Sequence, residues 1–216
     1  MYRVLVPAVL LLSLAGCGMA NSSFTEGLAN SGQPSPRSQR NQETGSVDQS
    51  TKRAAVVTET GKDKAPKGTF EKAPAGALAD RDFSHTHLDA ERARELVNAY
   101  RKEKGLRPLR LQPALTEAAR AHSQDLAKWD RISHFGSDGS NPWDRVKRTG
   151  YSAKLAAENV GTGQASFEEV MKGWRASPGH NKNLLLPEAE HMGIALVQDG
   201  KTEFKTFWTL VIGSPL

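Results

Sequence analysis

The stretch Phe207-Trp208-Thr209-Leu210-Val211-Ile212 carries large apolar side chains at both odd and even positions. A strand that is apolar on both faces is covered on both faces, so this stretch is predicted to be a central strand of a sheet. Residues 193–197 form a second β-rich run before it, and Asp199-Gly200 between the two runs is typical of a hairpin. The C-terminal part of the chain therefore predicts a hairpin whose second strand is buried.

Helices are predicted upstream of this hairpin, because apolar residues recur there at helical spacing. The first is expected over about 88–104 and the second from Pro113 through Trp129. Shorter helices are predicted from Asn141-Pro142 to about Gly150, from the capping box Ser166-Phe167-Glu168-Glu169, and from Ser177-Pro178 to Pro187. Helices followed by a buried sheet, with further helices between, predict an α+β fold built in layers.

The start of the chain has the order of a secretory signal, with Arg3, an apolar run over 4–14 and small residues before Cys17. The run is about half of the roughly 20 residues that a membrane-spanning helix needs. Leu14-Ala15-Gly16-Cys17 resembles the lipobox of bacterial lipoproteins. That resemblance implies a signal peptide over 1–16 and a diacylglycerol thioether on Cys17. The protein would then be exported and anchored on the periplasmic side of the outer membrane or at the cell surface. An ordinary cleaved signal with an incidental cysteine is the alternative.

Composition divides the remaining chain into two parts. Residues 17–84 are rich in Ser, Gln, Asn, Gly, Lys and Pro and poor in large apolar residues, so they are predicted to be a disordered linker after the lipidated cysteine. Residues 85–216 contain all four tryptophans and are long enough for one core. The net charge of +5 is mild, and nucleic-acid binding would need basic residues clustered on one face, so no nucleic-acid partner is expected. The expected partner is the membrane, through the lipid on Cys17.

Several short motifs follow one another in the predicted domain. They are Ser133-His134-Phe135-Gly136, Ala157-Glu158-Asn159-Val160, Ser177-Pro178-Gly179-His180, Asn183-Leu184-Leu185 and Phe207-Trp208-Thr209. In this order and spacing they resemble the bacterial form of the CAP superfamily, also called the SCP-like or cysteine-rich secretory, antigen 5 and pathogenesis-related-1 family. The resemblance covers about residues 87–215. It implies a three-layer α-β-α sandwich with an open groove.

The resemblance also implies where a site would lie. The two groove histidines of the family fall on His134 and His180, and a groove glutamate falls on Glu158. Some members bind zinc with these histidines, so Zn²⁺ or another divalent metal is the cofactor to test. Many members have a second glutamate three residues after a tryptophan, but the residue three after Trp174 is Ser177. The site is therefore expected to be one carboxylate short.

From the residues alone, His134, Glu158 and His180 are metal-ligand types, and three protein ligands with a water make an open zinc site. No local motif fixes them together, because they are far apart in the sequence. The alternative is a polar network in which hydrogen bonds hold the two histidines. Imidazoles in such a network can still respond to pH.

Other residues are assigned to the groove more loosely. Asn159 and Asn183 lie beside motif residues, and His122 lies on the apolar stripe of the second helix, which favours a core histidine that can line the groove floor. Ser177 is better explained as a helix cap than as a nucleophile, since a base must approach from elsewhere in the fold. The cluster of positive charges at Arg145, Lys147 and Arg148 is interpreted as a solvated helix end. Trp129 or Trp143 could hold an apolar or sugar ligand.

Three functions follow from these observations. The first is a binding module of the cell envelope, with cell wall, lipid or protein as the groove ligand. The second is a zinc-dependent hydrolase with His134 and His180 as ligands and Glu158 as ligand or general base. The third is a carrier of lipid or sterol. Whether the protein is an enzyme stays open at this point, because a fold does not determine an activity.

Overall fold

The computed structural model describes residues 62–216. The predicted signal peptide, Cys17 and the predicted linker up to residue 61 lie outside the described residues. The helices are α1 (Ala90–Glu103), α2 (Pro113–Trp129), α3 (Pro142–Arg148), α4 (Phe167–Ala176) and α5 (Pro178–Leu184). The strands are β1 (Phe70–Glu71), β2 (Arg110–Leu111), β3 (Ile132–Ser133), β4 (Ala153–Thr162), β5 (His191–Gln198) and β6 (Thr206–Pro215). Within 62–216, no helix is both long and apolar enough to cross a bilayer.

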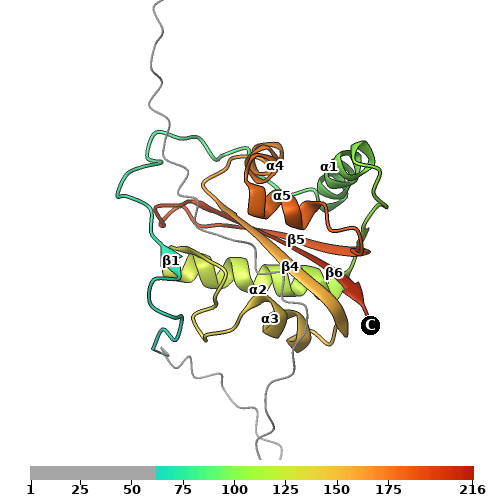
Figure 1. The fold of residues 1–216 in the computed structure, drawn as a ribbon. Coiled ribbons are helices and arrows are strands. Elements are labelled where there is room, and N and C mark those ends of the chain that lie inside the picture. Colours follow the sequence, from blue (N-terminus) through green and yellow to red (C-terminus); the bar gives the residue numbers. More distant parts are fainter. Residues whose placement is uncertain (1–61) are drawn as a thin grey trace, which may run out of the picture.

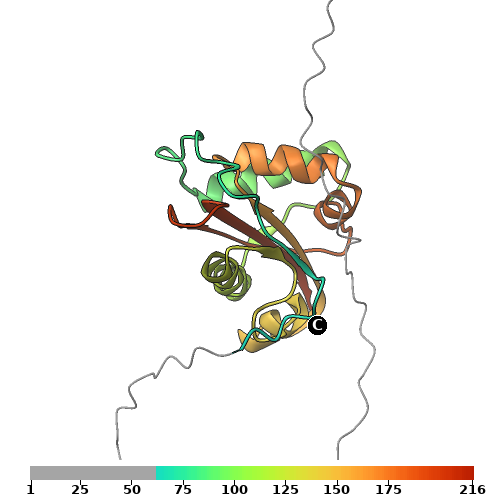
Figure 2. The same cartoon turned by 90° about the vertical axis from the view of Figure 1, so that its left-hand side faces the viewer.

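One sheet forms the middle layer, with the strand order β2-β5-β6-β4. β6 lies inside this sheet and pairs antiparallel with both β5 and β4, which confirms the predicted central strand. Figures 1 and 2 show α1, α4 and α5 covering one face of the sheet and α2 and α3 the other. The predicted α+β fold, a three-layer α-β-α sandwich, is therefore confirmed.

The core fills both spaces between the layers. Between the sheet and the layer of α1, α4 and α5, the core includes Trp208 of β6 and Trp174 of α4. Between the sheet and α2, it includes Val211 of β6 and Leu115 of α2. α2 approaches β5 at the level of the backbone, since a Cβ placed on Gly193 would lie 2.1 Å from backbone atoms of Leu115 and Thr116. A glycine is needed there because nothing larger than a hydrogen fits between the two elements.

Strand β4 was not predicted. It runs over Ala153–Thr162 and pairs with β6 from Ala153 to Thr162. Its centre, Ala156-Ala157-Glu158-Asn159, contains neither β-branched nor aromatic residues, so propensity gives no strand signal there. The strand forms because the long central strand β6 supplies a partner along its whole length.

The predicted boundary between linker and domain at residue 85 is wrong. Residues 62–84 lie against the sandwich, and Figure 2 shows them running over one end of it. β1 pairs antiparallel with β3, Arg81 is paired with Glu169 of α4, and the Gly76 amide donates to Glu203. A polar segment can be ordered without an apolar stripe when hydrogen bonds and ion pairs hold it to a surface that is already folded. Composition alone does not detect such contacts.

The helix ends agree with the predictions in part. Asn141 and Asp144 form a full capping box at α3. At α4 only half of the predicted box forms, because Glu169 bonds the amide of Ala165 instead of that of Ser166. Ser177 occupies the N-cap position of α5, but its side chain makes no capping bond. The β5–β6 connection spans 199–205 and is longer than a two-residue turn.

Candidate functional site

The carboxylate of Glu158 is the centre of a buried polar network. β4 is an edge strand, and successive side chains of a strand point to opposite faces, so Glu158 faces α2 and α3 while Asn159 faces α5. The Glu158 side chain is 1% exposed. Its Oε2 accepts from Arg145 Nη2 at 2.7 Å, and its Oε1 accepts from His134 Nδ1 at 2.9 Å. His122 Nε2 lies 3.5 Å from the same Oε1.

The charge of this network explains the ionisation of Glu158. Burial alone would raise the pKa of the carboxyl. The positive charge of Arg145, followed by the contributions of His122 and His134, outweighs burial and holds the pKa well below its usual range. Glu158 is therefore an anion whose charge is balanced inside the protein. A buried charge needs such a partner, because removal from water is otherwise too unfavourable.

His134 lies at the boundary between this network and the surface, with a side chain 14% exposed. An ionised carboxylate can only accept, so His134 Nδ1 carries the proton that is donated to Glu158. In the neutral imidazole, Nε2 is then left unprotonated. The backbone is held as well, since Arg145 Nη2 donates to the carbonyl oxygen of His134 at 3.0 Å. His134 thus has a defined tautomer and a defined ring orientation.

His180 belongs to the first turn of α5, on the other side of the sheet edge. Asn159 Nδ2 donates to its carbonyl oxygen at 3.1 Å, which ties α5 to β4. Burial, and then the charge of His134, lower the pKa of His180 to about 4. At neutral pH its imidazole is therefore neutral, and it is an electrostatic neighbour of His134.

With the fold and the surroundings of the two histidines described, the chain can be compared with known proteins. The model of the cysteine-rich secretory protein family (CAP) matches residues 94–212, more than half of the chain. The chain belongs to the CAP family. It is similar to the uncharacterised protein YkwD of Bacillus subtilis, with 36% identity over 154 residues, which are 69% of this chain and 58% of YkwD. The uncharacterised membrane protein YlbC of the same organism is 26% identical over 121 residues, 56% of this chain and 35% of YlbC.

The chain therefore spans little more than half of one of these curated relatives and about a third of the other. Two solved structures share the CAP fold. An extracellular SCP-domain protein of Bacillus anthracis has a TM-score of 0.51 at 24% identity, covering 57% of this chain and 39% of that protein. An outer surface protein of Borrelia burgdorferi has a TM-score of 0.53 at 19% identity, covering 61% of this chain and 99% of that protein.

The structure separates the predicted groove residues of this CAP domain into two groups. His134 and His180 reach the surface, and Ser177 lies half-buried one turn before His180. Asn159 and Asn183 are buried and hold α5 to β4: Asn183 Nδ2 donates to the Glu158 carbonyl and to Asn159 Oδ1, both at 3.0 Å. The prediction that these asparagines line the groove is therefore wrong. Their amides satisfy backbone and side-chain acceptors inside the protein.

His122 is a core histidine, as its position on the α2 stripe predicted. It is fully buried, and its Nε2 donates to the carbonyl oxygen of Ser133 at 2.8 Å. Burial is the main cause that lowers its pKa to about 4. It lies beside the Glu158 carboxylate inside the protein, and its side chain is not accessible to a ligand.

Arg145 is the site residue that the sequence interpretation missed. It was assigned to a solvated helix end together with Lys147 and Arg148. Those two residues are exposed, but Arg145 is 6% exposed and pairs with Glu158. The available signal was its place on α3, three residues after Pro142 and next to Val146, on the buried face. Its partner could not be inferred locally, since Glu158 lies on a different element.

The predicted three-ligand metal site does not fit the donors present. Within 62–216 no group of three or more His, Cys, Asp or Glu side chains is placed to hold a metal ion. Both oxygens of Glu158 are already engaged, which leaves two imidazoles. A carboxylate that holds the Nδ1–H of a metal-binding histidine is a common orienting partner, and Glu158 fits that role. The His134 and His180 nitrogens could thus hold a divalent metal only as a two-residue set.

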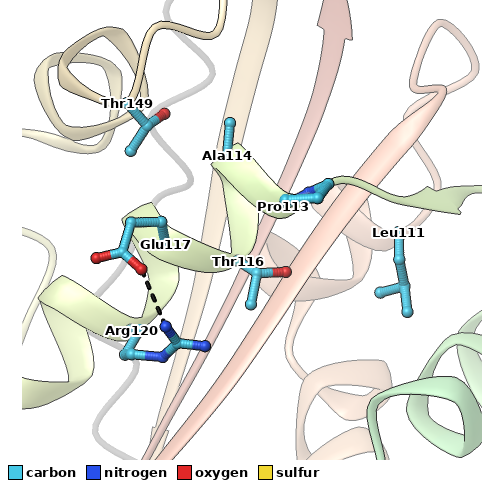
Figure 3. A pocket seen from close by; sticks show the side chains of 7 residues that line it. All are labelled: Leu111, Pro113, Ala114, Thr116, Glu117, Arg120 and Thr149. Atoms are coloured by element: carbon cyan, nitrogen blue, oxygen red, sulfur yellow. Dashed lines mark hydrogen bonds and ion pairs between the residues drawn. The ribbon is translucent and has the colours of Figure 1, made fainter.

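A shallow surface depression lies away from this network (Figure 3). It surrounds the first turns of α2, where Glu117 and Arg120 pair at 3.0 Å, and Thr149 closes one side. Neither histidine of the candidate site lines it. Trp129 and Trp143 are half-buried, and Trp129 packs against Arg131 with 5.5 Å between the guanidinium and the ring centre. A ligand role for either tryptophan stays a prediction.

Proposed function

We propose that this CAP domain is a binding module that works outside the cytoplasm and that recognises its ligand with His134 and His180. The observation that carries the proposal is the enclosure of Glu158, whose two oxygens are occupied by Arg145 and His134. The groups left at the surface are two imidazoles. The Nδ1–H of His134 is already donated to Glu158, so its neutral imidazole offers the Nε2 acceptor, whereas a neutral His180 imidazole carries one donor and one acceptor. Such groups suit polar ligands such as a cell-wall glycan or peptide.

The extracytoplasmic location rests on two supports. The first 16 residues have the order of a secretory signal that ends at Cys17. The similar structures include an extracellular protein of B. anthracis and an outer surface protein of B. burgdorferi. Attachment to a membrane through a lipid on Cys17 belongs to the same proposal.

A hydrolase that uses Glu158 as general base is not favoured. An effective general base has a pKa near the working pH and reaches the proton that it takes. The pKa of Glu158 lies well below its usual range, and its carboxylate is closed off from the surface. A lipid carrier finds no support at this site either, since the contacts of His134 are with the charged side chains of Glu158 and Arg145.

Metal binding without catalysis is the second candidate. The Glu158 carboxylate accepts from His134 Nδ1, so in the neutral form of this imidazole the free lone pair lies on Nε2. His180 is neutral at neutral pH, as a metal ligand must be. A bound divalent metal would supply a Lewis acid that could itself bridge to an anionic ligand.

Two titrations test the proposal. The purified chain should cosediment with isolated cell walls, and His134→Ala/His180→Ala should reduce the bound fraction at least about tenfold, whereas the exposed control His87→Ala should bind like the parent. Calorimetric titration with Zn²⁺ tests the second candidate. Micromolar binding by the parent that is lost in His134→Ala/His180→Ala would assign the metal to these two histidines. Cell-wall binding that survives loss of both histidines, in a folded variant, would contradict the proposal.

A further inference from the structure

The segment 63–71, here called the latch, contacts the loop that carries His134. Asp63 Oδ2 accepts from Arg131 Nη1 at 2.5 Å, and the Lys64 amide donates to the Ser137 carbonyl oxygen at 2.7 Å. Further along, Phe70 pairs with Ser133 in the β1–β3 ladder. The contacts fall before and after His134, so both sides of the residue are held by the same segment.

Arg131 depends on the latch for its charge balance. Its side chain is 1% exposed, and its ion partners among the described residues are Asp63 at 2.5 Å and Asp125 at 3.8 Å. Its Nε and Nη2 have no hydrogen-bond partner within 62–216. The guanidinium also stacks on Phe70, with 5.0 Å to the ring centre. Loss of the latch would leave a buried cation with one distant carboxylate.

Ser133 carries the effect from the latch to His134. Its hydroxyl donates to the Thr69 carbonyl oxygen at 2.7 Å and accepts from the Phe135 amide at 2.9 Å. Its own carbonyl oxygen accepts from His122. The Ser133 hydroxyl therefore joins the latch to the backbone on both sides of His134, in addition to the β1–β3 ladder and the Lys64–Ser137 bond. This backbone sets the direction of the imidazole.

We propose that residues 63–71 position His134, so that release of this segment loosens the loop 131–139 and weakens binding at the His134–His180 pair. The latch is also the first described part of the chain after residue 61. The effect on the loop is independent of the proposed function, whereas the effect on ligand binding rests on it.

Hydrogen exchange measured by mass spectrometry on the purified chain tests the effect on the loop. In Asp63→Ala the amides of 132–139 should exchange about tenfold faster or more, because the hydrogen bond and ion pair to Arg131 are lost. Amides of α5 should be unchanged. Arg81→Ala is the matched control: Arg81 lies in the same ordered segment but pairs with Glu169, away from His134.

Asp63→Glu should restore slow exchange, and Asp63→Asn, which keeps an acceptor but removes the charge, should fall between. If Asp63→Ala unfolds, exchange will be faster in all peptides and not only in 132–139. The Asp63→Asn variant then replaces it in the test. Unchanged exchange at 132–139, or equal acceleration in Arg81→Ala, would overturn the proposal. If the parent binds cell walls, Asp63→Ala should bind them at least about threefold more weakly; equal binding with a loosened loop would overturn the coupling while leaving the proposed function intact.

Discussion

Glu158→Gln tests whether the buried network stabilises the domain as a set of paired charges. The substitution keeps the shape of the side chain and removes its charge, so the guanidinium of Arg145, 6% exposed, loses its carboxylate. The removal of one partner of a buried ion pair costs about 3–5 kcal/mol. A whole domain is stable by about 5–15 kcal/mol, so the variant should lose a large part of its unfolding free energy.

The measurement is urea unfolding of four proteins: the parent, Glu158→Gln, Arg145→Met and the double variant. The double variant should be more stable than the sum of the single effects by about 2 kcal/mol or more, because it leaves neither charge unpaired. Glu169→Gln is the control, since its pair with Arg81 is half-exposed and should be worth less than about 1 kcal/mol. A Glu158→Gln effect below about 1 kcal/mol, or additive single effects, would refute the reasoning.

Two further predictions concern the histidines and the close approach of α2 to the sheet. The pKa values of His122 and His180 are lowered to about 4, mainly by burial, so the unfolded state binds more protons between about pH 6.5 and 4. The unfolding free energy should therefore fall as the pH falls through this window, with further loss below about pH 4.3 as Glu158 becomes protonated on unfolding. Denaturant midpoints at each pH measure this change in stability. A stability that does not vary with pH would contradict the prediction. Gly193→Ala should cost more than about 3 kcal/mol or prevent folding, because its Cβ would overlap the backbone of α2, whereas Gly173→Ala on the open face of α4 should be neutral or stabilising by up to about 1 kcal/mol. Thermal melts compare the two, and similar melting temperatures would contradict the packing.

The candidate site was predictable in its members but not in their roles. His134, Glu158 and His180 were recognisable from short motifs, and the structure brings them to one edge of the sheet. Their division into two surface imidazoles and one enclosed carboxylate depends on Arg145, which comes from a different helix. The choice of partner for a buried charge is made in three dimensions, so a sequence that shows both residues does not show that they meet.

The sequence by itself determined the central strand β6 and the helices on either side of the sheet, because hydrophobic period and end signals are local properties. Only the tertiary structure decided that 153–162 is a strand and that 62–84 belongs to the folded part. Ala157 and Glu158 become strand residues because β6 offers them backbone partners, and Asp63 becomes ordered because Arg131 needs a counter-ion. In both places the energy comes from a group distant in the chain, which no local pattern records.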